Sequence, residues 1–128
     1  MQNELRIGNW VCDSKYTQYP MQVVCVGSDY VYLDFEGNEG DVWECDCKEI
    51  EPIPLTEELI AKCMFSEYEF EDDIFLHDEE DVCVQKSYKE YYPYNFENSD
   101  TIGNPIRYLH QLQNLFFALT GKELEIKL

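Results

Sequence analysis

The chain has 128 residues, of which 45% are hydrophobic and 15% aromatic, and this composition excludes a disordered polyelectrolyte and predicts a folded globular protein. Its 27 Asp and Glu residues against 9 Lys and Arg give a formal net charge of −18, which excludes nucleic acid and anionic membranes as direct partners because both would repel it. The natural complement of this charge is a basic protein surface, a metal ion or a polyamine.

The first part of the chain predicts a small β-unit. LRIGNWV opens an extended segment, and MQVVCVGSDYVYLDF predicts two strands, rich in Val and Tyr, around a Gly-Ser turn. EGNEGD offers two glycines for another turn, and VWECDC then alternates so that Trp43, Cys45 and Cys47 share one face. Four or five short strands with tight turns indicate a small SH3-like β-barrel unit over residues 1–52.

Residues 53–128 predict a second, α+β unit, although the two units could also form one compact domain. EPIPLTEELIAKCMF predicts a short helix that Thr56 caps, because a threonine side chain accepts hydrogen bonds from free backbone N–H groups at a helix start. The alternating EYEFE, followed by IFLH, VCVQ and YKEYYPYNF, predicts an antiparallel meander with strands within 67–96. The fold class is therefore α+β.

The clearest helix follows a polar loop. Asn104 is expected to cap an amphipathic helix over 105–120, with a proline in its first turn, and Gly121 is expected to end it. ELEIKL then alternates as a short final strand over 123–128.

Three segments together, LRIGNWV, EPIPLTEELI and YLHQLQNLFFALTGKELEI, resemble a family of uncharacterised small proteins from Bacteroidales genomes, phages and mobile elements. The family has no assigned activity, so the resemblance implies no catalytic residue. It does imply a mobile-element origin, which favours a protein that manages or blocks a host system. The chain departs from the family at CMFSEYEF, which lacks the glycine of the family's turn, and its acidic tract is not part of the shared signature.

That acidic tract is the strongest feature of the sequence. Residues 63–85 hold nine carboxylates and no Lys or Arg, which is half of the net charge. On a strand, Glu67, Glu69 and Glu71 would stand about 6.6–6.8 Å apart on one face, with a neighbouring strand about 4.8 Å away. Duplex DNA carries one phosphate per about 3.4 Å of each strand, so an acidic sheet face could approach its charge density.

We therefore expect a non-enzymatic binding protein that acts as a DNA mimic, such as an anti-CRISPR, on a basic surface of a host nucleic-acid-binding enzyme. The residues expected to present the charge are Glu67, Glu69, Glu71, Asp72, Asp73, Asp78, Glu79, Glu80 and Asp81. Tyr88, Tyr91 and Tyr92 are expected to add contact area. One alternative is a solvated surface kept for solubility. Another is a structural or accessory protein of the element that acts as a homodimer or through a neighbouring protein.

Metal, cofactor and catalytic motifs are weak. The acidic tract lacks the glycine and the spacing of a calcium loop, and no phosphate-binding loop, G-x-S-x-G or H-E-x-x-H motif occurs, so we expect no cofactor and no enzymatic activity. A zinc site would combine the single C-x-C pair with further thiols or imidazoles, drawn from Cys45, Cys47, Cys63, Cys83, His77 and His110. Buried core thiols are the preferred interpretation, because structural zinc usually takes two C-x₂₋₄-C knuckles.

The opening MQNELRIGNW lacks a basic segment followed by an apolar one, and the longest apolar run, LFFAL, is too short to span a membrane. We therefore expect a cytoplasmic protein whose six cysteines are mostly reduced.

Overall fold

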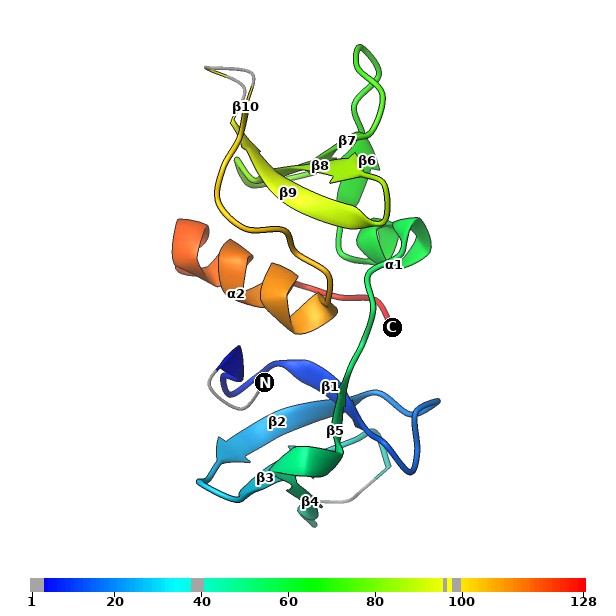
Figure 1. The fold of residues 1–128 in the computed structure, drawn as a ribbon, viewed down its shortest axis with the longest axis vertical. Helices are drawn as coiled ribbons and strands as arrows, with labels where there is room; N and C mark the ends of the chain where they lie inside the picture. Colours follow the sequence, from blue (N-terminus) through cyan, green and yellow to red (C-terminus); the bar gives the residue numbers. More distant parts are fainter. Residues whose placement is uncertain (1–3, 38–40, 96, 98–99) are drawn as a thin grey trace. The chain divides into compact units, whose positions relative to one another are not determined.

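The structure, a computed structural model, describes residues 4–37, 41–95, 97 and 100–128. These residues form a mixed α+β fold with two antiparallel sheets, which confirms the predicted class (Figure 1). In chain order the strands and α-helices are β1 (Trp10–Asp13), β2 (Met21–Val26), β3 (Tyr30–Asp34), β4 (Trp43–Asp46), β5 (Ile50–Pro52), α1 (Glu57–Lys62), β6 (Phe65–Glu67), β7 (Ile74–His77), β8 (Cys83–Ser87), β9 (Glu90–Asn95), β10 (Asp100–Thr101) and α2 (Leu109–Thr120).

The chain divides into two units, each of which contains one sheet. Unit 1 comprises Met1–Pro54 and Tyr108–Asn114, and unit 2 comprises Leu55–Arg107 and Leu115–Leu128. Helix α2 therefore contributes its first residues to unit 1 and the remainder to unit 2.

The sheet of unit 1 has the strand order β4-β3-β2-β1-β5. The β2–β3 hairpin forms where the sequence predicts it, and its turn requires Gly27 because a Cβ atom there would lie 2.9 Å from the carbonyl oxygen of Tyr30. A 3₁₀ helix, Cys47–Glu49, joins β4 to β5, and the Asp46 side chain caps it by accepting from the backbone N–H of Lys48. Strands β4 and β5 are the two edges and do not pair with each other, so the predicted barrel is not closed.

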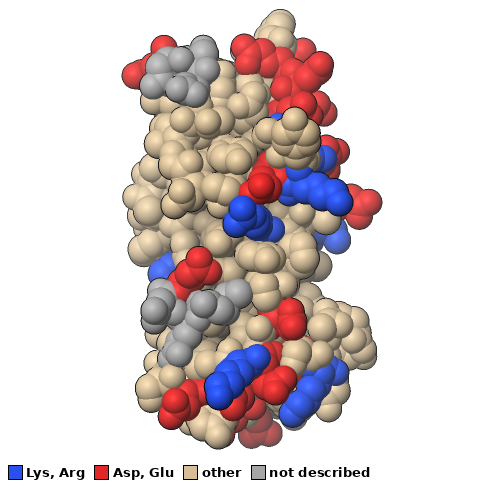
Figure 2. Space-filling view, in the orientation of Figure 1, with Lys and Arg blue, Asp and Glu red and all other residues tan. Residues whose placement is uncertain are grey.

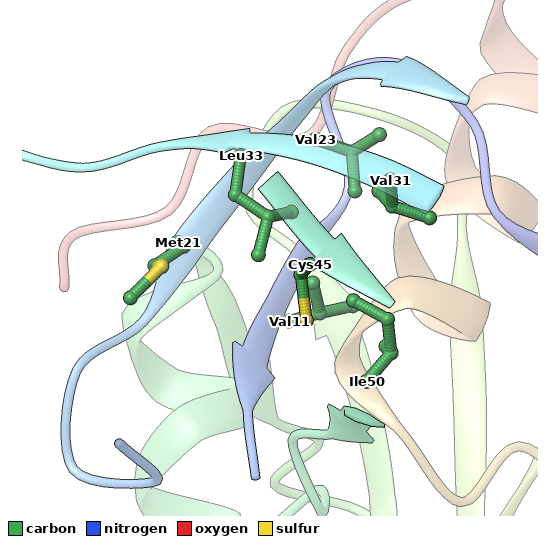
Figure 3. Close-up of a cluster of buried hydrophobic side chains, with 7 residues drawn as sticks. All are labelled: Val11, Met21, Val23, Val31, Leu33, Cys45 and Ile50. Atoms are coloured by element: carbon green, nitrogen blue, oxygen red, sulfur yellow. The ribbon is translucent and has the colours of Figure 1, made fainter. Parts of the chain in front are cut away.

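Alternating residues of the five strands meet in the core of unit 1. The buried members of this core are Val11, Met21, Val23, Val31, Leu33, Cys45 and Ile50 (Figure 3). Burying a side chain of the size of Val, Leu or Ile stabilises a fold by about 1.5–3 kcal/mol relative to leaving it exposed. This core therefore fixes the register of the strands and the positions of the loops between them.

Helix α2 completes unit 1 through buried amide side chains. The Oε1 atom of Gln113, a residue 2% exposed, accepts from the backbone N–H of Trp10 at 2.8 Å, and its Nε2 atom donates to the carbonyl of Gly8 at 3.0 Å. The Nδ2 atom of Asn9 donates to Oδ1 of Asn114 at 2.9 Å. Residues at the two ends of the chain thus satisfy each other's buried polar groups, which would be costly to leave unpaired.

Unit 2 holds the second sheet, with the order β10-β9-β8-β7-β6, and helix α1. The predicted cap of α1 is confirmed, because the backbone N–H of Leu59 donates to Oγ1 of Thr56 at 3.1 Å. The meander is confirmed as well: β7 coincides with the predicted IFLH and β8 is one residue longer than VCVQ, whereas β6 and β9 are shorter than EYEFE and YKEYYPYNF.

The predicted start of the C-terminal helix is wrong. Helix α2 begins at Leu109 rather than at residue 105, because Ile106 and Tyr91 exchange backbone hydrogen bonds and hold the preceding residues extended. The end is confirmed: the helix stops at Thr120, and Gly121 follows with a φ of 72°, the left-handed conformation that glycine adopts without strain.

The predicted final strand over 123–128 is also wrong. The alternation does bury Leu124 and half-bury Ile126, but no strand of unit 2 pairs with this segment within the described residues. One backbone hydrogen bond, from Lys127 to the carbonyl of Lys62, holds it in place.

Candidate functional site

The nine predicted carboxylates lie in two groups at the two ends of β7. The first group, called here the first acidic loop, consists of Glu67 at the end of β6 and the loop 68–73 that joins β6 to β7, and it holds five of them. The second acidic loop, residues 78–81, follows β7 and holds four. Asp73 before β7 and Asp78 after it are five positions apart, about 17 Å along the strand, whereas Glu67 pairs with Phe75 and so lies nearer to the second group. Figure 2 shows red side chains gathered over the first acidic loop, at the upper right.

The predicted strand through EYEFE is wrong beyond Glu67. The last cross-strand pair joins Glu67 to Phe75, and the chain then turns, with the N–H of Tyr68 donating to the carbonyl of Ile74 and Asp73 at a φ of 64°. Alternation can continue a strand only where a partner strand is present, and β7 begins at Ile74. The regular row of carboxylates on one strand face therefore does not form.

The second acidic loop is organised by a histidine. The Nδ1 atom of His77 accepts hydrogen bonds from the backbone N–H groups of Glu79, at 3.2 Å, and Glu80, at 3.0 Å. The imidazole ring is 9% exposed and packs against the rings of Phe65 and Phe116, with centroid distances of 5.2 and 4.7 Å. A side chain held in this way fixes the backbone of the second acidic loop at Glu79 and Glu80.

Most of these carboxylates face solvent without a cation. Lys122 forms an ion pair with Glu80, and Asp78 accepts from the hydroxyl of Ser66 at 2.7 Å. Among the residues that the structure describes, the other seven form no ion pair with Lys or Arg, and all seven are exposed. The pKa of Cys83 is raised to about 12. Burial is the main cause, and the negative charges of Asp81 and Glu71 add to it.

Both acidic loops contribute to one surface hollow of about 430 Å³, called here the acidic hollow. Its lining residues are Ser66, Glu67, Tyr68, Glu69, Phe70, Leu76, His77 and Asp78. The rings of Tyr68 and Phe70 meet edge to face at 5.4 Å, and Phe70 is 76% exposed. Three carboxylates beside two aromatic rings suit a guanidinium or ammonium group, which carboxylates bind through charge-assisted hydrogen bonds and aromatic faces bind through cation–π attraction.

The predicted tyrosine contacts have different outcomes. Tyr88 is 95% exposed at the β8–β9 turn and is available to a partner, whereas Tyr92 is half-buried. Tyr91 is 1% exposed and packs against Phe75, so its prediction as a contact is wrong. The sequence prediction missed Phe70, because strand alternation assigned this residue to the core.

Burial keeps several thiols protonated. All six cysteines are free, and burial raises the pKa of Cys63 to about 12; at Cys45 burial, followed by the charge of Asp13, has the same result. Burial also lowers the pKa of His110, against the opposing effect of its 3.1 Å contact with Glu4. A reactive thiolate nucleophile is therefore not provided by Cys45 or Cys63.

Metal-binding clusters and membrane-spanning helices are both absent from the described residues. No group of three or more His, Cys, Asp or Glu side chains there lies close enough to hold a metal ion, so the zinc alternative has no ligand set among these residues. No helix in the described part of the chain has the length and apolar character needed to cross a membrane.

Comparison with known proteins gives no family assignment. No protein-family description matches the chain, and no curated protein or solved structure matches it either. The resemblance to the Bacteroidales family stays a prediction.

Proposed function

We propose that the chain is a non-enzymatic acidic binding protein of a Bacteroidales phage or mobile element. It acts as an anti-CRISPR-like inhibitor by occupying a basic, nucleic-acid-binding surface of a host protein. The acidic hollow carries this proposal, because it combines three carboxylates with an exposed aromatic ring, and none of the described residues that line it is Lys or Arg.

The proposed contact has a charged and an apolar part. Glu67, Glu69 and Asp78 receive Arg or Lys side chains of the partner, and Phe70 packs against the guanidinium plane or the aliphatic stem. The unpaired carboxylates of both acidic loops steer the encounter over distances comparable to the Debye length, about 8–10 Å at physiological salt.

The mimicry is one of charge rather than of phosphate spacing. The carboxylates of the two acidic loops do not reproduce the regular phosphate spacing of a duplex, because the predicted row of carboxylates along one strand does not form. An Arg/Lys-lined channel would still accept them, because phosphate contacts depend mainly on charge and position.

Self-association through the edge strand β6 is the less favoured alternative. This strand has only three residues and carries the exposed Glu67, so an antiparallel pair of copies would bring like charges close together. A basic partner avoids this repulsion.

Two finer proposals accompany the function. Unit 1 is proposed to be SH3-like, supported by its strand order and by the 3₁₀ helix between β4 and β5. A cytoplasmic location is proposed on the six free thiols.

The test compares two variants that carry the same net charge. In the first, Glu67, Glu69 and Glu71 become Gln and Asp72 and Asp73 become Asn. The second neutralises five exposed acids elsewhere: Asp29→Asn, Glu44→Gln, Glu51→Gln, Glu58→Gln and Glu125→Gln.

Pull-downs from Bacteroidales lysate should show capture of nucleic-acid-binding proteins by the wild type and by the second variant, and loss of capture by the first. Added DNA should release the captured proteins. Equal capture by both variants, or release unaffected by DNA, would contradict the proposal.

A further inference from the structure

A second hollow lies in unit 1, between the β1–β2 and β3–β4 loops, and has a volume of about 380 Å³. Its lining residues are Tyr16, Tyr19, Met21, Phe35, Glu36 and Trp43. This volume is within the range of about 300–1,000 Å³ that small-molecule sites occupy. Four of the six lining side chains are aromatic, and all six belong to unit 1.

The aromatic rings that line the hollow are nearly perpendicular to their neighbours. The ring of Tyr16 meets that of Trp43 at a centroid distance of 5.5 Å and an interplanar angle of 84°, and Phe35 meets Trp43 at 6.3 Å and 75°. The rings that line the hollow therefore lie in different planes. This arrangement differs from a flat stack, in which each face is covered by the next ring.

The ring of Trp43, which contacts both Tyr16 and Phe35, is held in place by hydrogen bonding even without a ligand. The indole Nε1 of Trp43 donates to Oδ2 of Asp13 at 3.0 Å, and Asp13 is 4% exposed. Oδ1 of the same carboxylate accepts from the backbone N–H of Lys15 at 2.9 Å, which ties the loop carrying Tyr16 to the carboxylate that orients Trp43. A preformed site loses less entropy when it binds.

The electrostatics of the hollow select a cation. Glu36 is the charged residue of its described lining, no Lys or Arg contributes to it, and the aromatic faces carry the negative side of the ring quadrupole. An ammonium or guanidinium group must satisfy three or five N–H donors with acceptors or water, and aromatic faces do not supply strong acceptors. A quaternary ammonium keeps its positive charge without any donor.

We propose that this hollow, the aromatic cage, binds a trimethylammonium group. The rings of Tyr16, Tyr19, Phe35 and Trp43 surround the methyl groups, and the carboxylate of Glu36 balances the charge at the rim. Trimethyllysine in a protein and a free small molecule such as choline present the same group. The cage does not depend on the acidic loops, which belong to unit 2.

The first experiment measures binding by the fluorescence of Trp43 in the full chain with Trp10→Phe, which leaves one tryptophan. The probes are choline, N-acetyl-trimethyllysine amide, N-acetyl-lysine amide and 3,3-dimethylbutan-1-ol, the uncharged carbon isostere of choline, at an ionic strength held constant with KCl. Saturable binding of a trimethylammonium probe, about tenfold tighter than that of its uncharged or unmethylated counterpart, is expected.

Preference for trimethyllysine over choline identifies a protein side chain as the source, the reverse preference identifies a free molecule, and both support the cage. Equal binding of choline and its isostere, or no saturable signal, overturns the proposal.

Variants provide the second readout. Tyr19→Leu removes a ring that is 57% exposed, and Glu36→Gln removes the rim charge; each should weaken choline binding at least about fivefold. Tyr30→Leu is the matched control, because Tyr30 is 45% exposed on β3 and does not line the cage. The five-amide variant of the first acidic loop should bind choline as the wild type does. Equal losses for Tyr19→Leu and Tyr30→Leu would count against the cage.

Discussion

A hydrogen bond of 3.0 Å joins the side chains of the buried Asp13 and the half-buried Trp43 in unit 1. The carboxylate has two acceptor oxygens, and the second accepts from the backbone of Lys15. One buried charge therefore holds both a strand residue and a loop in place.

Replacing this carboxylate with an amide should destabilise the protein. In Asp13→Asn the amide accepts one of the two hydrogen bonds and turns its own NH₂ toward the other donor, so the free energy of unfolding should fall by about 1–3 kcal/mol at pH 7. Urea unfolding followed by tryptophan fluorescence measures the loss. Asp29→Asn, at an exposed position, should change stability by less than about 0.5 kcal/mol.

The same pair predicts a pH dependence. Burial acts to raise the pKa of Asp13, but hydrogen bonds from Lys15, Trp43 and Cys45 outweigh burial and hold the pKa below its ordinary value. A lowered folded-state pKa gives stability that is complete above the unfolded value, about 3.9, and is lost as the pH falls through the folded value. The stability difference between wild type and Asp13→Asn should be constant above about pH 5 and shrink below about pH 4. A difference that grows on acidification would contradict this assignment.

His77 should control the order of the second acidic loop. His77→Leu removes the acceptor of two backbone N–H groups and should destabilise the protein by about 1–3 kcal/mol. His77→Asn places a carboxamide oxygen near the position of Nδ1 and should retain part of the effect. Hydrogen exchange at the amides of Glu79 and Glu80 is the measurement: exchange should be fast in the leucine variant and intermediate in the asparagine variant. Unchanged protection in His77→Leu would show that these bonds do not hold the loop.

The cysteines should react with alkylating agents at very different rates. Cys25 is exposed and should be labelled first by iodoacetamide at pH 8, whereas Cys45, Cys63 and Cys83 are buried with pKa values raised to about 12 and should remain unlabelled in the native protein. Mass spectrometry of the labelled peptides measures the order, and labelling in urea, where all six should react, is the control. Rapid native labelling of Cys63 would mean that its surroundings open readily.

Phe70 should be a major contributor to partner binding. Phe70→Ala should reduce the affinity for a captured basic protein by about 2 kcal/mol, because the variant loses the apolar area of the ring and its attraction to a cation of the partner. Stability should be nearly unchanged because the ring is 76% exposed. Titration of the purified partner measures the affinity. Tyr30→Ala removes an exposed ring from unit 1 and should have no effect, so equal losses in the two variants would argue against a contact at the acidic hollow.

Local signals predicted the elements that local interactions stabilise. The β2–β3 hairpin follows from Val and Tyr alternation around Gly27, the start of α1 from Thr56, and the end of α2 from Gly121. In each case the deciding hydrogen bond or conformation lies within a few residues of the signal.

The predicted boundaries are wrong where pairing with a residue distant in the sequence determines where a helix or strand begins or ends. Helix α2 starts late because Ile106 pairs with Tyr91, and the EYEFE strand ends early because its partner strand begins only at Ile74. The aromatic cage combines residues of two loops with the first residues of β2 and β4, which pairing of the strands brings together. Its available signal was the concentration of aromatic residues at strand ends, at Tyr16, Tyr19, Phe35 and Trp43.

The amide contacts of Gln113 also have a consequence for the order in which the molecule is made. The residues they join, Trp10 and Gly8, lie 103 and 105 positions earlier in the chain. Unit 1 therefore cannot be completed while its own strands leave the ribosome; it waits until α2 has been synthesised and most of unit 2 has already emerged. A nascent chain stalled before α2 should consequently expose Asn9 and the start of β1 to proteases.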